Sequence, residues 1–276
     1  MTILNHITLD ALVRLPMSEI VALPAAELAE RVLGHAQKAA LAACAKGKSY
    51  IADPERCKFD PAKIACHGKE TDACLTRAQV ISARMIYKDA VEPGTKRVLH
   101  GQMPGAEALK GSWDTWIIGT APSAAGKASQ EEFARNFYAN MVAGNPTYKI
   151  EDVTDADIVK GRAQYGDLID AQNPDLSAYK ARGGKLIQYH GWNDPAISAK
   201  YSTAYFSDAQ KTMGDTSDFY RLFMVPGMLH CRGGDAPTDV DWLPILEEWV
   251  EHGKAPDTVT AKGAGSETQT LTRRKS

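Results

Sequence analysis

The chain has 276 residues, of which 44% are hydrophobic and 24% charged, and its formal net charge is −2 at pH 7. This length allows one large core or two smaller ones. The balanced charge argues against nucleic acid or acidic lipid as a partner, and no run approaches the roughly 20 apolar residues of a membrane-spanning helix, so small and roughly neutral substrates fit better.

The first expected helix leads into a cluster of cysteines. Apolar residues recur at helical spacing over 23–43, and this alanine-rich stretch ends at Cys44. Four of the five cysteines fit two short-loop disulfides, most simply Cys44 with Cys57 and Cys66 with Cys74. Such bridges imply an oxidising compartment, so we expect a secreted or periplasmic protein. A structural zinc site is the weaker alternative, because the cysteines do not form C-x₂-C pairs.

The start of the chain does not read as an export signal. Residues 1–6 lack both the charged and the apolar region of a signal peptide, so we expect any export signal to lie outside this sequence. The fifth cysteine, Cys231, stands alone beside His230. An odd cysteine in an exported protein usually indicates a missing partner.

The front part of the chain is irregular and mixed. A second helix is expected after Cys74, and a loop-rich region with glycine, proline and tryptophan follows over 94–126. A helical pattern resumes over 131–142. The apolar faces of these two helices are expected to carry Val80, Ile81, Ile86 and Tyr87 in the first, and Phe133, Phe137, Tyr138 and Met141 in the second.

The pattern becomes regular after Asp175. Strands are expected over 185–190 and 219–225, each followed by a helix, over 198–211 and 242–252 respectively. Strand, helix, strand, helix is typical of the last two crossovers of a parallel sheet. The polar final stretch is expected to be a disordered tail.

Two residues at the ends of these strands carry the catalytic signal. Asp194 lies in Tyr-His-Gly-Trp-Asn-Asp-Pro at 189–195, and His230 lies in Val-Pro-Gly-Met-Leu-His-Cys at 225–231. Acid and then histidine is the chain order of a serine α/β-hydrolase. Alone, Asp194 would be a turn or helix-capping residue, but the pair favours a catalytic origin. His190 is expected to pack behind the acid rather than to bind a metal.

The nucleophile of such a site is not apparent. It normally stands in G-x-S-x-G between a strand and a helix, and the nearest match, at 47–51, lacks the second glycine. Ser123 precedes Asp194 in the right order but has no strand before it. We therefore expect the chain to hold an acid and a base without the attacking hydroxyl.

The segment 183–256 closely resembles the C-terminal part of the tannase and feruloyl esterase family, which includes terephthalate monoester hydrolases. Residues 57–61, 74–76 and 104–107, with Trp113 and Trp116, resemble landmarks of that family's lid. The resemblance implies an α/β fold, an incomplete α/β-hydrolase with a mixed, disulfide-containing lid domain. Its expected domains are a lid remainder over 1–175, the C-terminal hydrolase part over 176–262 and a disordered tail over 263–276.

The resemblance also assigns roles to residues. It implies that Asp194 is the acid of the triad and that His230 activates a serine and later protonates the leaving alcohol. In the family the serine elbow precedes the lid, and the cysteine before that serine pairs with the one after the histidine, here Cys231. Trp116 would form a wall of the aromatic acyl pocket, although filling a lid core is the commoner fate of tryptophan.

The family's calcium loop is shortened here. At 44–54 two lysines stand where acidic residues are expected, and calcium prefers six or more oxygen ligands. We therefore expect no cofactor and no other metal, with calcium binding weak or absent.

The first functional hypothesis is a carboxylic ester hydrolase acting on esters of aromatic acids, here inactive alone because it lacks the nucleophile. The second is a non-catalytic module that binds aromatic ligands, or a half-domain that complements a missing N-terminal hydrolase half. A third possibility is that the chain does not fold alone, since an incomplete parallel sheet leaves an open edge.

Overall fold

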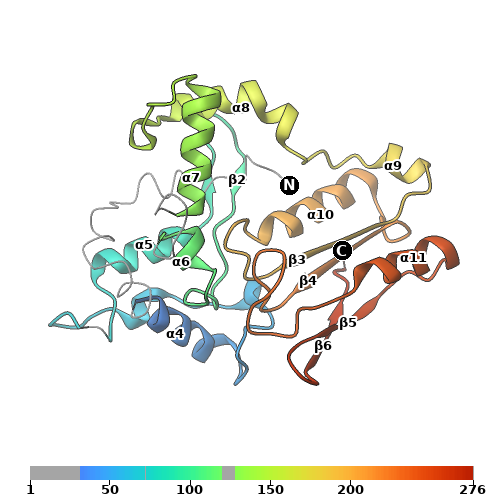
Figure 1. Ribbon diagram of the computed structural model, residues 1–276, viewed down its shortest axis with the longest axis horizontal. Coiled ribbons are helices and arrows are strands. Elements are labelled where there is room, and N and C mark those ends of the chain that lie inside the picture. Colours follow the sequence, from blue (N-terminus) through green and yellow to red (C-terminus); the bar gives the residue numbers. More distant parts are fainter. Residues whose placement is uncertain (1–31, 72, 120–127, 276) are drawn as a thin grey trace.

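The computed structural model describes residues 32–71, 73–119 and 128–275. Figure 1 shows the helices of the front part, blue to green, on one side of the molecule. On the other side lie two long strands, β3 (Leu186–Gly191) and β4 (Tyr220–Val225), with their helices. None of the described helices is both long enough and apolar enough to cross a membrane.

The first described helix, α4 (Gly34–Cys44), ends at the expected cysteine, and the expected residues 23–31 lie outside the described part of the chain. Its buried positions are Ala36 and Ala40, whereas Ala43 is exposed. Because α4 is rich in alanine, its sequence does not single out one apolar face, and the side that is buried depends on what the helix packs against. That partner is the core around Ile51, which the sequence pattern does not encode.

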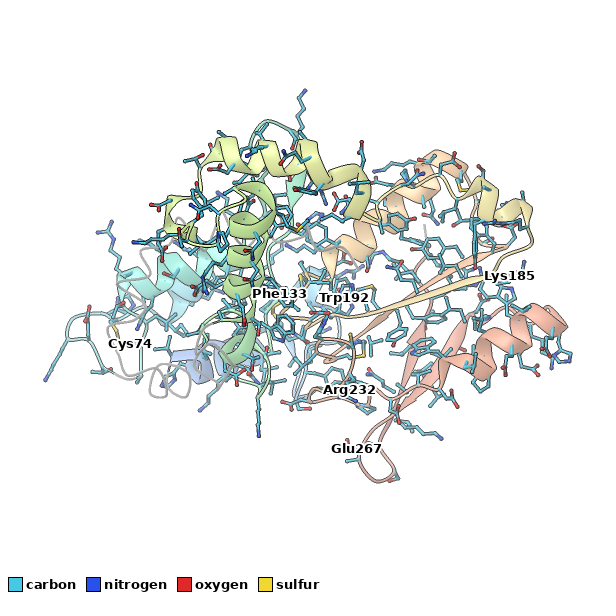
Figure 2. All side chains as sticks on the ribbon, turned by 45° about the horizontal axis from the view of Figure 1, so that its top comes forward. Cys74, Phe133, Lys185, Trp192, Arg232 and Glu267 are labelled. Carbon is cyan, nitrogen blue, oxygen red and sulfur yellow. A yellow bond between two sulfur atoms is a disulfide. The ribbon has the colours of Figure 1, made fainter. Side chains whose placement is uncertain are left out.

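The predicted cysteine pairing is confirmed. Cys44 is bonded to Cys57 and Cys66 to Cys74, with sequence separations of 13 and 8. The first bridge ties the end of α4 to the short helix η2 (Pro54–Arg56). In Figure 2 Cys74 lies at the periphery of the molecule, far from the strands, so the second bridge stabilises the outer edge of the front part.

Helix α5 (Arg77–Tyr87) follows η3 (Pro61–Ile64) and begins at a reciprocal cap, in which Gln79 N–H donates to Thr76 Oγ1 and Thr76 N–H to Gln79 Oε1. Val80 and Ile86 are buried as expected, but Ile81 is exposed. The buried side of α5 includes Ser82 and Ala83 together with Val80 and Ile86, so it does not coincide with the apolar residues of the helix.

A short antiparallel pair, β1 (Ala90–Val91) with β2 (Val98–Leu99), precedes α6 (Trp113–Trp116). The helix expected over 131–142 begins earlier, as α7 (Ser129–Asn136), and continues into the π-helical η4 (Phe137–Val142). Phe137 and Tyr138 are buried as expected, whereas Phe133 and Met141 are exposed. The wider π turn rotates the side chains beyond Asn136, so a single helical spacing does not fit the whole segment.

The chain then passes through η5 (Ile150–Asp152), α8 (Asp155–Ile169) and α9 (Ser177–Ala181). Thr154 and Asp157 form a capping box at the start of α8. Arg162 of α8 forms ion pairs with the buried Glu92 at 2.7 Å and with Asp170. The contact with Glu92, the residue after β1, holds α8 against the β1–β2 pair. Figure 1 shows α8 at the top of the molecule.

Strands β3 and β4 are parallel and in register from Leu186 opposite Tyr220 to Gly191 opposite Val225, which confirms the predicted parallel pair. The side chains of β4 alternate between the two faces of the sheet. Tyr220 and Leu222 pack with the crossover helix α10 (Lys200–Met213), while Phe223 and Val225 pack on the opposite face. The two strands therefore form one β-α-β unit.

The opposite face is covered by α11 (Trp242–His252) and a C-terminal hairpin. Helix α11 has the predicted bounds and ends at Gly253, whose φ of 70° suits a helix C-terminus. The hairpin pairs β5 (Thr258–Lys262) with β6 (Thr268–Thr272), and Figure 2 shows Glu267 near its turn. The prediction of a disordered tail over 263–276 is therefore wrong for residues 263–275. The stretch is polar by composition, but Leu271 lies between two threonines of β6 and is buried. It packs with Val259 and Ala261 of β5 in the cluster around Phe223.

Candidate active site

Backbone contacts bring the loops after β3 and β4 together. Asn193 N–H in the loop after β3 donates to the carbonyl of Met228 in the loop after β4, at 3.1 Å. A side chain at Gly191 would meet that same carbonyl, with an added Cβ only 2.3 Å from its oxygen, so this approach requires glycine. The carboxyl ends of the two strands thus place Asp194 and His230 side by side.

Asp194 and His230 form a direct hydrogen bond. His230 Nδ1 lies 2.9 Å from Asp194 Oδ2, and the Asp194 side chain is only 4% exposed. Burial opposes ionisation of Asp194, but the hydrogen bonds from His190 and His230 outweigh it and lower the pKa of Asp194 to about 2. In turn, the hydrogen bond that His230 donates to Asp194 raises the pKa of His230 above its ordinary value, against the effect of burial. The arrangement leaves Nε2 of His230 as the ring nitrogen available for proton transfer.

Two aromatic rings stand beside this pair. The ring of Trp116 meets that of His230 in a T-shaped contact, with 5.0 Å between centroids. Phe133 stacks on Trp116 at 6.4 Å and is 50% exposed, and Figure 2 shows it at the centre of the molecule. Trp113, by contrast, is buried in the front core with Ile86. The two tryptophans therefore divide into one core residue and one beside the candidate base.

Phe133 is a residue that sequence reasoning missed as a site candidate. Its helical spacing indicated a core position, yet its ring faces Trp116 at the end of α6 rather than the buried cluster around Phe137. The one usable signal was its position among acidic and polar neighbours in the first turns of α7, where a core residue is less expected.

The family model for tannase and feruloyl esterase matches residues 13–276. The chain belongs to this family. Among its relatives are an uncharacterized esterase of Xanthomonas campestris, 34% identical over 86% of this chain and 48% of that protein, and a probable feruloyl esterase of Arthroderma benhamiae, 32% identical over 86% and 47%. A mono(2-hydroxyethyl) terephthalate hydrolase of Piscinibacter sakaiensis is 30% identical over 74% and 39%.

Solved structures agree on the fold. Feruloyl esterase B from Aspergillus oryzae superposes with a TM-score of 0.82 at 23% identity, covering 98% of this chain and 57% of that one. A tannin acyl hydrolase from Aspergillus niger gives 0.71 at 21% identity, covering 99% and 54%. The fold is thus of the α/β-hydrolase type. The chain spans about half the length of the curated relatives that it matches.

In this tannase-family chain no hydroxyl from the described residues bonds to His230. Ser49, from the nearest elbow-like stretch, donates to the carbonyl of Asp235 instead, at 2.8 Å. Ser123 lies outside the described residues. A cavity of about 470 Å³ opens beside His230 along β3, and Asp194, Ser202 and Cys231 also line it. Of the described cysteines, Cys231 is the one outside a disulfide.

The loop that resembles the family's calcium site offers one carboxylate, that of Asp53. It pairs with Arg56 at 3.3 Å, and the ammonium group of Lys48 lies over the ring of Tyr50. The described residues contain no cluster of three histidine, cysteine or acidic side chains that could hold a metal ion. Calcium prefers six or more oxygen ligands, several of them carboxylates.

Proposed function

We propose that this chain supplies the acid and the base of a carboxylic ester hydrolase of the tannase and feruloyl esterase type, acting on esters of aromatic acids. The observation that carries the proposal is the 2.9 Å contact between buried Asp194 and His230 at the ends of adjacent parallel strands. Family membership supports the same reaction class.

The proposed chemistry is acyl transfer through a serine. His230 Nε2 takes the serine proton as the hydroxyl oxygen attacks the ester carbonyl, and Asp194 stabilises the resulting imidazolium. The C–O bond to the alcohol breaks, and the alcohol leaves with the proton from His230. Water then hydrolyses the acyl-enzyme by the same route, with His230 again as the base. The proposed wall for the aromatic acyl group is Trp116, whose ring contacts that of His230, with Phe133 stacked on it.

We further propose that the attacking serine comes from outside the described residues, and that those residues alone have negligible activity. Among the described strands β3 pairs with β4 only, and its other edge borders the cavity that holds His230. A strand from a hydrolase half that pairs with this edge would deliver a hydroxyl to the cavity. Without a nucleophile, a serine hydrolase retains only the contributions of binding and the oxyanion hole, about 10³-fold over water.

The purified chain should be assayed with methyl ferulate, alone and with the N-terminal half of a family relative added. We expect hydrolysis only in the mixture, and its abolition by His230→Ala in this chain. Turnover by the chain alone that disappears with His230→Ala would contradict inactivity and place the serine within the chain. Turnover in the mixture that survives His230→Ala would contradict the assigned base.

A second candidate is a non-catalytic module that binds aromatic acids. The stacked pair of half-buried Trp116 and exposed Phe133 favours it, because such rings offer a face for a phenolic ligand without any reaction. Calorimetric titration with ferulate tests it. Binding of ferulate together with no turnover in any mixture would support this candidate over the hydrolase.

We also propose that the protein works in an oxidising compartment and without calcium. The two confirmed disulfides and the carboxylate-poor loop at 44–54 support these statements. An unchanged melting temperature on addition of calcium or EDTA is the expected result, and a rise with calcium would contradict it.

A further inference from the structure

The Asp194 carboxylate is held by four donors. Oδ1 accepts the backbone N–H groups of Ala196 and Ile197 at 2.8 and 2.9 Å. Oδ2 lies 2.9 Å from His230 Nδ1 and 3.2 Å from Nε2 of a second imidazole, that of His190. One oxygen is thus fixed by backbone, and the other is shared by two histidines.

The surroundings of His190 decide its tautomer. Its Nε2 faces the Asp194 carboxylate and the carbonyl oxygen of Ile197, both acceptors, so Nε2 carries the proton. In the neutral ring Nδ1 is then an acceptor, and the hydroxyl of Ser202 donates to it at 2.7 Å. The proton positions follow from the partners of each nitrogen.

The chain of donors continues into the sheet. Ser202 Oγ accepts from Gln188 Nε2 at 2.9 Å, and Gln188 Oε1 accepts from the hydroxyl of Tyr220. Tyr220 and Ser202 are buried, and they come from β4 and from the first turn of α10. Gln188 and His190 lie two residues apart on β3, so their side chains share one face of the sheet. Every donor in this relay points toward Asp194.

His230 itself has few restraints. It lies on a glycine-rich loop, and among described residues the Asp194 carboxylate is its hydrogen-bond partner. Apart from the T-shaped contact with Trp116, the orientation of its ring therefore depends on where Oδ2 points. An error of about 1 Å in such a group can cost about 100-fold in rate.

We propose that His190 is a positioning residue that fixes Oδ2 of Asp194 for His230, and that the Tyr220–Gln188–Ser202 relay holds its ring in the required tautomer. Outer partners of this kind orient a working side chain without touching substrate. The inference rests on the proposed function, because the position of His230 matters only if it acts as the base.

The test compares two substitutions of His190, each of which keeps a polar group near only one of the two ring nitrogens. His190→Gln places an amide nitrogen near the former Nε2 and keeps a donor for Asp194, whereas His190→Asn reaches only the position of Nδ1 and loses it. The readout is the NMR titration midpoint of His230 in the ¹⁵N-histidine-labelled chain, assigned by its absence in His230→Gln. Asp194→Asn sets the full effect, which is a decrease of the His230 midpoint because the hydrogen bond to the carboxylate is the largest cause of its raised pKa.

We expect His190→Asn to lower the His230 midpoint by about half of that full effect or more, because a released Oδ2 turns away, and His190→Gln to retain the wild-type value. Ser202→Ala should lower the His230 midpoint by a smaller amount. If His190→Asn does not fold, the Ser202→Ala result tests the proposal in its place. Three results would overturn the proposal. The midpoint could stay unchanged, or it could shift equally in the Gln and Asn variants. It could also rise, because Oδ2 becomes a stronger acceptor for His230. The readout needs no turnover. A protein that shows the expected shifts but stays inactive in the mixture with the N-terminal half of a relative would therefore refute the proposed hydrolase function and leave the positioning role intact.

Discussion

The ring of Trp116 and the imidazole of His230 meet in a T-shaped contact at 5.0 Å, although one belongs to the helical front part and the other to the loop after β4. Phe133 stacks on the same indole. The candidate site is therefore built where the two parts of the chain meet, and neither part provides it alone.

Removal of the Trp116 ring should weaken binding of aromatic acids. Trp116→Ala takes away the stacking face beside His230, and an aromatic contact contributes about 1 kcal/mol beyond burial, so we expect ferulate to bind about fivefold more weakly by calorimetry. Trp113→Phe is the matched control, because Trp113 lies in the front core and should affect stability without changing ferulate affinity. Equal loss of affinity in both variants would place the ligand elsewhere.

The pKa of Asp194 gives stability a characteristic pH dependence. Because its pKa falls from 3.8 to about 2 on folding, the unfolded chain binds more protons below about pH 4. The free energy of unfolding should therefore decrease by about 2 kcal/mol between pH 4 and pH 2, and this part should be missing in Asp194→Asn. Urea denaturation at pH 5 and at pH 2 measures it. A wild-type decrease over this range that is identical in Asp194→Asn would mean that other carboxyl groups account for it.

The raised pKa of His230 acts in the opposite direction. Its stabilising contribution is fully present below the ordinary pKa of 6.5 and is lost as pH rises through the folded value. Asp194→Asn should remove this dependence as well, because the Asp194 hydrogen bond is the largest cause of the shift. We expect the difference in denaturation midpoint between wild type and variant to be smaller at pH 9 than at pH 6. An equal difference at the two pH values would contradict this contribution of His230.

The C-terminal half was largely predictable from sequence because its signals are local. The strand that ends before Asp194 is a short apolar run after two glycines, and α11 ends at a glycine with positive φ. The order of Asp194 and His230 in the chain also fixed their proximity, since parallel strands end at one edge. Such features need no knowledge of distant partners.

The front part was less predictable because its packing is decided by distant residues. The core face of α4 and the outward turn of Phe133 depend on partners elsewhere in the fold. Helix α8 does carry a local signal, the Thr154 and Asp157 capping box, but its apolar stripe is weak because its buried positions are glycines. The relay behind Asp194 was not visible either, since it joins side chains from two strands and a helix.

The C-terminal hairpin should contribute to stability. Leu271 of β6 is 2% exposed and packs in the cluster around Phe223 and Val225. Leu271→Ala should lower the free energy of unfolding by about 2–5 kcal/mol, as expected for a cavity in a packed core. Thr270→Ala is the matched control on the exposed face of the same strand and should change it by less than about 0.5 kcal/mol. A hairpin that is loose in solution would make the two variants indistinguishable by urea denaturation.

The disulfide that joins α4 to η2 should stabilise the front part by restricting the unfolded chain. It connects Cys44 to Cys57 across a separation of 13 residues, for which chain entropy predicts about 2–4 kcal/mol. The double variant Cys44→Ala/Cys57→Ala should therefore unfold at lower denaturant, and dithiothreitol should destabilise it less than it destabilises the wild type. Cys231→Ser is the control, since this exposed thiol forms no bridge with a described residue. If reduction shifts the wild type no more than the double variant, the bridge stabilises nothing, and its restraint on the unfolded chain is offset by strain in the folded loop.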